Sequence, residues 1–176
     1  MVWCLMDKHP KETEAIIIDA GALIDYCHSD PMVLNLISTN LGRLHVATWV
    51  LAEVKELDER RAAALGISVI EPNLIQMAEA AAGVGALSFA DRICMILARD
   101  NGWTCITNDT ALRQECRKAG IKVLWGLETL AHLVDRGSLT ATKAGEIAEK
   151  IHQTNPYFIN QNILQRFYKQ IGVNPD

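Results

Sequence analysis

The sequence predicts an α/β fold, a three-layer sandwich in which a central parallel sheet of about five strands is flanked by helices. Short β-branched apolar runs alternate with longer stretches of helix-forming residues along most of the chain, which is typical of parallel α/β proteins. The runs are apolar at consecutive positions, as in strands that are buried on both faces. The 176 residues are 49% hydrophobic and 22% charged, a balance that excludes a disordered or fibrous protein and suits one compact domain.

Five segments have the composition of strands, because each is a short run rich in β-branched and other apolar residues. From the N-terminus they are residues 15–19 (AIIID), 43–49 (RLHVATW), 67–72 (ISVIEP), 103–107 (WTCIT) and 121–125 (IKVLW). Pro72 ends the third run. We expect all five segments to pair in one parallel sheet.

Helical segments fill the intervals between the strands. Asn73 has the position of an N-cap, and Phe89, Ile93 and Leu97 recur with the spacing of one helix face, which Gly102 then closes. The interval after the second strand is rich in strong helix formers. The predicted helices are residues 21–28, 32–41, 51–65, 73–82, 88–100 and 109–120.

The chain divides into three predicted parts. A mixed leader covers residues 1–14, the α/β domain covers residues 15–136, and a C-terminal helical extension covers residues 137–176. An apolar stripe of helical spacing runs through the extension from Ile159 to Ile171. We expect this stripe to pack on the sheet of the same domain; the alternatives are a dimer surface and a groove for a partner helix.

The net charge predicts that a nucleic acid, if bound, is held by a local group of residues, and the cysteine content predicts a cytoplasmic protein. The net charge of −4 gives no general excess of basic residues. The five cysteines are odd in number and include no CxxC pair, which is typical of free thiols in a reducing compartment. The N-terminus lacks the apolar segment of a signal peptide and no apolar run is long enough to span a bilayer, so we expect no membrane association.

Four acidic residues stand at the ends of predicted elements and are the candidate site. Asp19 ends the first strand, Glu53 and Asp91 lie in the first turns of two helices, and Asp109 follows the fourth strand. In a parallel α/β sheet the carboxyl ends of strands and the N-terminal ends of helices share one edge, where ligands bind. The sequence contains no P-loop, GxSxG or HExxH motif that would indicate a different chemistry.

Converging carboxylates repel one another, so such a cluster is stable when it is protonated or holds cations. Oxygen ligands without histidine or thiolate favour Mg²⁺ or Mn²⁺, and these ions promote phosphodiester hydrolysis by activating water. Each acid also has a purely structural interpretation. Asp109 or Asn108 can be an N-cap, Asp91 can form a capping box with Ser88, and Glu53 can be a surface acid. Asp19 directly follows three isoleucines, where an acid without a partner is costly.

Four stretches, IIIDAGALIDY, ATWVLAEV, LSFADRICMILARDNG and CITNDTALRQECRKAGIKVLWGLETL, together resemble a PIN-domain protein, in particular the VapC-like ribonuclease toxins of prokaryotic toxin-antitoxin pairs. The resemblance covers roughly residues 15–135. It implies that Asp19, Asp91 and Asp109 are the principal metal ligands and that Glu53 is a further ligand or positions water. Thr107 and Asn108 match the polar residues that support the fourth acid.

The resemblance further implies an endoribonuclease that depends on Mg²⁺ or Mn²⁺, cleaves single-stranded or looped RNA, forms a homodimer and is inhibited by a small antitoxin protein. Two other interpretations stay open: a catalytically weak PIN scaffold that binds RNA or a protein partner, and a housekeeping RNA-processing nuclease. Arg113 and Arg92 are the basic residues considered for RNA contact, since they lie close to the acids in the sequence. Three tryptophans at strand boundaries are expected to pack at the edge of the core rather than to stack on bases, namely Trp49, Trp103 and Trp125.

Overall fold

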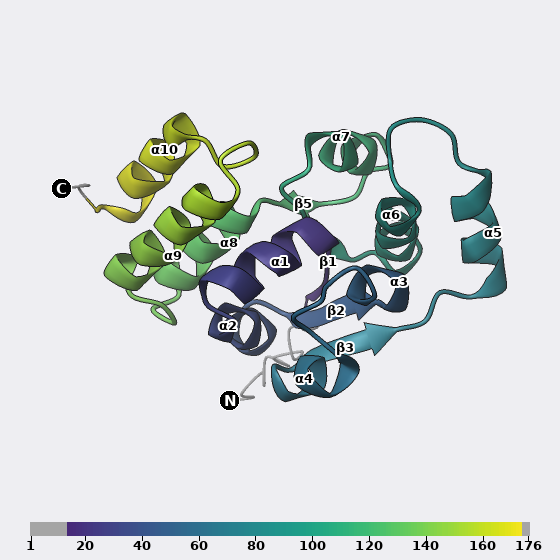
Figure 1. Ribbon diagram of the computed structural model, residues 1–176, viewed down its shortest axis with the longest axis horizontal. Coiled ribbons are helices and arrows are strands. Elements are labelled where there is room, and N and C mark those ends of the chain that lie inside the picture. The colour runs from purple at the N-terminus through teal and green to yellow at the C-terminus, as the bar shows by residue number, and fades with distance from the viewer. Residues whose placement is uncertain (1–13, 174–176) are drawn as a thin grey trace, which may run out of the picture.

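The computed structural model describes residues 14–173, and its centre is a parallel sheet of five strands between layers of helices (Figure 1). The leader predicted at residues 1–14 lies outside the described residues except for Glu14. The strands are β1 (Ala15–Ile18), β2 (Arg43–Ala47), β3 (Ile67–Ile70), β4 (Thr104–Ile106) and β5 (Val123–Leu124). The five predicted strands are therefore confirmed, although each is shorter than its apolar run.

The strands lie in the order β3-β2-β1-β4-β5 and every pair is parallel. In the register of the sheet, Ile17 pairs with His45 on one side and with Cys105 on the other. All carboxyl ends consequently meet at one edge. The chain leaves β1 toward β2 and leaves β4 toward β5, so the direction of travel reverses between β1 and β4, the place where α/β sheets bind ligands.

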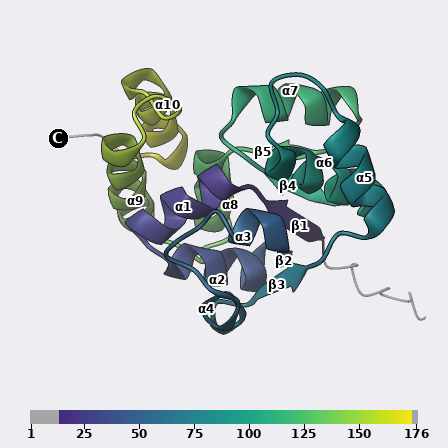
Figure 2. The same cartoon turned by 45° about the vertical axis from the view of Figure 1, so that its right-hand side comes forward.

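Helices cover both faces of the sheet (Figure 2). The helices α1 (Ala20–Ser29) and α2 (Met32–Asn40) connect β1 to β2, whereas α7 (Thr110–Lys118) connects β4 to β5 in the opposite direction. Right-handed crossovers place these two connections on opposite faces. The helix α6 (Phe89–Asn101) packs against β1, β2 and β4 and is the main cover of its face. Because β1 is covered on both faces, Ile16, Ile17 and Ile18 are all buried.

The predicted helix over residues 51–65 is wrong. The structure has a short helix α3 (Thr48–Leu51), a turn over residues 52–58, and a second helix α4 (Glu59–Ala64). The break is stabilised because Val54 and Leu57 bury their side chains in the turn and Asp58 accepts a hydrogen bond from the backbone N–H of Arg61 at 2.7 Å, as an N-cap. Glu53 therefore lies in a turn and not in a helix. The predicted helix 73–82 is present as α5 (Leu74–Ala82), capped by Asn73.

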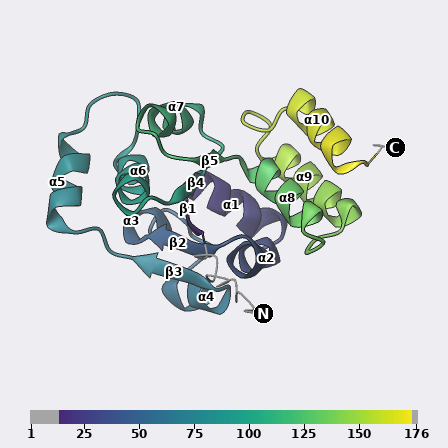
Figure 3. The same cartoon turned by 180° about the vertical axis from the view of Figure 1, so that it is seen from behind.

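Three helices follow the sheet: α8 (Gly126–Asp135), α9 (Ala141–Thr154) and α10 (Gln161–Ile171). The helix α9 packs on α1, and α10 packs on α8 and α9 (Figure 3). The stripe from Ile159 to Ile171 thus packs on the helices α8 and α9, and not on the sheet as expected. No helix between residues 14 and 173 has the length and apolar composition needed to cross a membrane.

Candidate active site

Asp19 is a buried carboxylate at the junction of β1 and α1. It is only 3% exposed and serves as the N-cap of α1: its Oδ1 accepts a hydrogen bond from the Ala22 N–H at 2.7 Å, and its Oδ2 accepts one from the hydroxyl of Thr107. Burial raises the pKa of Asp19 to about 7 in spite of these two bonds, with smaller contributions from the charges of Asp91 and Asp25. A cation that binds in place of the proton would stabilise the ionised form of this buried carboxylate.

The turn after β4 brings a second acid to the same edge. Asp109 is the N-cap of α7, since its Oδ1 accepts from the Leu112 N–H at 2.7 Å. Its own N–H donates to the hydroxyl oxygen of Thr107 at 3.0 Å, and that hydroxyl in turn donates to Asp19. Thr107 therefore ties the end of β1 to the turn that carries Asp109. Asn108, the other predicted supporting residue, is also buried.

Asp91 lies in the first turn of α6 and is half-buried. Its Oδ2 accepts from the Ser88 N–H at 3.0 Å and from the Ser88 hydroxyl at 2.7 Å, which completes a capping box. The negative charge of Asp91 raises the pKa of Asp19 and also that of Glu53, whose pKa is raised first by partial burial. Asp91 thus lies within electrostatic range of both acids, although Glu53 itself is exposed.

These donors fit a hard divalent cation held by few protein ligands. Within residues 14–173, no three histidine, cysteine or acidic side chains stand close enough together to hold a metal ion on their own. Mg²⁺ is commonly held by one or two carboxylates, with water and substrate phosphates completing its shell. Asp19 and Asp91 provide such a pair, and both are oxygen donors that repel each other when ionised.

Arg113 is buried beside the acids rather than exposed toward solvent. Its side chain donates to the backbone oxygen of Asn108 at 2.9 Å and to the hydroxyl of Thr110 at 3.1 Å, and its guanidinium lies 3.6 Å from the ring centre of Trp125. Burial lowers the pKa of Arg113, and the negative charge of Asp109 opposes that change. The residue holds the turn in place and supplies positive charge there, while its contact with RNA stays a prediction.

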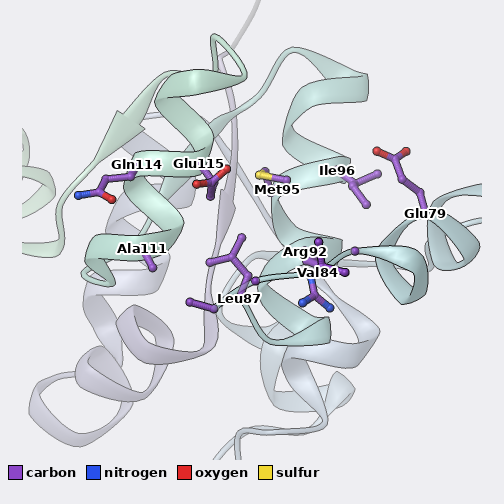
Figure 4. A pocket seen from close by; sticks show the side chains of 12 residues that line it. Glu79, Val84, Leu87, Arg92, Met95, Ile96, Ala111, Gln114 and Glu115 are labelled. Atoms are coloured by element: carbon purple, nitrogen blue, oxygen red, sulfur yellow. The ribbon is translucent and has the colours of Figure 1, made fainter.

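Arg92 is half-buried between α6 and the loop over residues 83–88. It donates to the backbone oxygen of Ala80 at 3.3 Å, and a side chain at Gly83 would collide with it. A cavity of about 400 Å³ opens here between α5, α6 and α7 (Figure 4). Figure 4 shows Leu87 and Met95 between α6 and α7, with Arg92 near the loop. The four candidate acids do not line this cavity, so it is distinct from the carboxylate site.

Asp25 and Trp49 have surroundings that the sequence did not predict. Asp25, on α1, is 4% exposed and accepts hydrogen bonds from Asn108 and Asn155, partners so distant along the chain that no local motif could reveal them. Trp49, on α3, is 47% exposed and packs edge-on against Phe89, with ring centres 5.1 Å apart. The expected burial of Trp49 at the core edge is therefore wrong, because α3 projects it from the end of β2.

The other two tryptophans pack on protein groups, as expected. Trp103 stacks on His45 with ring centres 4.1 Å apart, and Trp125 lies beneath Arg113. The four cysteines in the described part of the chain, Cys27, Cys94, Cys105 and Cys116, are free thiols.

Comparison with solved structures finds this fold in a PilT N-terminus domain protein from the hyperthermophilic archaeon Sulfolobus solfataricus P2. The TM-score is 0.53 and the sequence identity is 16%, and the match covers 67% of this chain and 92% of the archaeal chain. No protein-family model and no curated protein matches the sequence. The predicted PIN-like fold, with its parallel five-stranded sheet flanked by helices, is therefore confirmed.

Proposed function

We propose that the chain is a metal-dependent endoribonuclease. The observation that carries the proposal is the state of Asp19, a buried carboxylate whose pKa is about 7 and which faces the charge of Asp91 at the switch point of the sheet. Such a group is unfavourable for folding when ionised, so its position is best explained by a cation. The PIN-like fold, found in the archaeal PilT N-terminus domain protein, supports a nuclease.

In this proposal Asp19 and Asp91 hold Mg²⁺ or Mn²⁺ directly, and Asp109 acts on the ion through a water molecule of its shell. A bound ion of this kind activates water and stabilises the oxygens of an in-line phosphoryl displacement. Thr107 fixes Asp19 through its hydroxyl. Glu53 is exposed and its pKa is raised, so its carboxylate suits the acceptance of a proton from water at the rim of the site.

Cleavage of a mixed, structured RNA by the purified protein tests this proposal. Cutting should require Mn²⁺, stop in EDTA and be lost in Asp19→Asn. Asp58→Asn is the matched control, because Asp58 is an exposed N-cap of α4 and is not one of the candidate metal ligands. Equal cutting by Asp19→Asn and wild type would refute the assigned site.

A catalytically weak scaffold is the second candidate. The observation in its favour is that Asp19 and Asp109 are helix N-caps and that Asp91 completes a capping box with Ser88, so each has a structural role without catalysis. Binding of RNA without metal-dependent cutting would favour this candidate.

The toxin role, an antitoxin partner, the homodimer and the cytoplasmic location enter the proposal through the sequence resemblance alone. A toxin should arrest growth when expressed without its partner, whereas a housekeeping RNA-processing nuclease should not. A small protein encoded beside this chain should bind it and stop the cutting. The mass of the purified protein in solution tests the dimer.

A further inference from the structure

The carboxylate of Asp25 is buried next to the candidate site but has no part in the chemistry proposed above. It lies on α1, is 4% exposed, and has two amide side chains as its hydrogen-bond donors. Asn108 donates to Oδ2 at 2.9 Å, and Asn155 donates to Oδ1 at 3.0 Å and to Oδ2 at 3.2 Å. Because Asp25 has so few donors, removing either one would leave this buried carboxylate poorly hydrogen-bonded and would destabilise the protein.

The bond to Asn108 reaches the turn that carries Asp109. Both polar atoms of the Asn108 side chain are hydrogen-bonded: its NH₂ group donates to Asp25, and its carbonyl oxygen accepts from the Gly126 N–H at 2.9 Å. The oxygen of Gly126 accepts from the hydroxyl of Tyr26 at 2.7 Å. A Cβ at Gly126 would lie only 3.1 Å from the Asn108 amide, so the fit leaves little freedom. Because Asn108 immediately precedes Asp109, the network fixes the backbone from which Asp109 projects.

The bond to Asn155 comes from the predicted C-terminal extension. Asn155 ends α9 as its C-cap, and its backbone is anchored by hydrogen bonds to the oxygen of Ile151 at 2.7 Å and from the N–H of Ile159 at 3.0 Å. The helix α9 packs along α1, which carries Asp25. The extension therefore reaches the catalytic turn through one buried residue.

We propose that Asp25 is a positioning residue of the nuclease site and that Asn155 makes the C-terminal helices part of that site. Asp25 holds Asn108, and so the turn of Asp109, only while Asn155 also donates to it. This inference rests on the proposed function for its effect on catalysis. Groups that orient a metal-binding side chain without touching the metal are often nearly as important to activity as the ligands.

A reciprocal exchange of side chains tests the proposal. Asn155→Asp alone places two carboxylates face to face and is the decisive single variant. Asp25→Asn alone is milder, because the Asn155 amide can turn its oxygen toward the new amide at position 25. In the double variant, the new amide at position 25 can donate to the new carboxylate at position 155 while its oxygen still accepts from Asn108. Thr154→Ala is the matched control, because the Thr154 hydroxyl bonds only to backbone oxygens within α9.

Cleavage is measured well below the melting temperature of each variant, with kcat and KM determined separately. Asn155→Asp should lose about 10-fold or more in kcat with little change in KM, and Asp25→Asn should lose less. The double variant should recover most of the loss of Asn155→Asp, and Thr154→Ala should behave as wild type. A purely structural role would lower the melting temperature and leave kcat unchanged. If Asn155→Asp fails to fold, Asn155→Ala removes the donor without adding charge.

Hydrogen exchange at the backbone amides of Asp109 and Gly126 gives a readout that needs no activity. Exchange should be faster in Asn155→Asp and return toward the wild-type rate in the double variant. Wild-type exchange in folded Asn155→Asp or Asn155→Ala, or a double variant no better than Asn155→Asp, would overturn the proposal. If the wild-type protein cuts no RNA with Mn²⁺, the proposed function fails, while amide exchange still decides whether the extension holds the turn.

Discussion

Replacing Asp19 by Asn should stabilise the metal-free protein above neutral pH, although it should abolish cleavage. Burial raises the pKa of Asp19 from its ordinary value of 3.8 to about 7. Since one pKa unit corresponds to about 1.36 kcal/mol, ionising the native carboxylate costs about 4 kcal/mol relative to the unfolded chain. Between pH 4 and pH 7 the native state retains a proton that the unfolded state has lost, so the free energy of unfolding falls as pH rises and levels off above about pH 7.

Asparagine avoids this cost and can keep the local bonds. Its carbonyl oxygen can accept from the Ala22 N–H, and its amide can donate to the Thr107 oxygen, although the Thr107 hydroxyl then loses its acceptor. Allowing for that loss, we expect the variant to be more stable than wild type by about 2 to 4 kcal/mol at pH 8. The difference should fall by about 4 kcal/mol between pH 8 and pH 4, so that near pH 4 the variant is equal to wild type or less stable by up to about 2 kcal/mol.

Urea unfolding in EDTA, followed from pH 4 to pH 8, measures this difference. Other acids titrate in both proteins, so the difference between the two curves isolates Asp19. Asp58→Asn makes the same atomic change at an exposed N-cap, where burial contributes nothing. A difference that does not vary with pH, or a variant less stable than wild type at pH 8, would refute the reasoning.

Three further predictions concern the metal, the capping box and the exposed tryptophan. Mn²⁺ at about 100 times its Kd should stabilise the wild-type protein at pH 8 by about 2.7 kcal/mol and stabilise Asp19→Asn far less. Equal increases in the melting temperature of the two proteins on adding Mn²⁺ would count against a metal site at Asp19. Ser88→Ala should cost about 1 kcal/mol of stability by removing the cap. It should also lower kcat, because Asp91 loses the hydroxyl donor and keeps only the backbone N–H of residue 88. Unchanged kcat at a lower melting temperature would contradict this effect. Trp49→Ala should raise KM for single-stranded RNA about fivefold, from the loss of about 1 kcal/mol of base stacking, whereas Trp49→Phe should keep most of the affinity. An unchanged KM in Trp49→Ala would show that Trp49 does not contact the RNA.

The parts of the fold that depend on local interactions were predictable from the sequence. Asn73 and Ser88 cap helices where the sequence indicated caps, and the runs of consecutive apolar residues are strands buried on both faces. The order of the acids along the chain, together with the rule that parallel strands end at one edge, was enough to bring Asp19 and Asp109 together.

The missed features depend on contacts between distant segments. Helix propensity favours a continuous helix over residues 51–65, but burial of Val54 and Leu57 in a turn outweighs it. The partners of Asp25 lie 83 and 130 residues further along the chain, so neither bond leaves a local pattern. Exposure of Trp49 follows from the short helix α3, which the sequence did not separate from the strand before it.

The capping roles of three acids bear on how this site would change during evolution. Asp19, Asp91 and Asp109 each stabilise the start of a helix, so selection for a folded protein alone would retain them after catalysis had ceased. Glu53 lies exposed in a turn and caps no helix, and so nothing but its chemistry would preserve it. Among relatives of this chain, the residue at position 53 should therefore be the first to drift in a lineage that no longer cuts RNA.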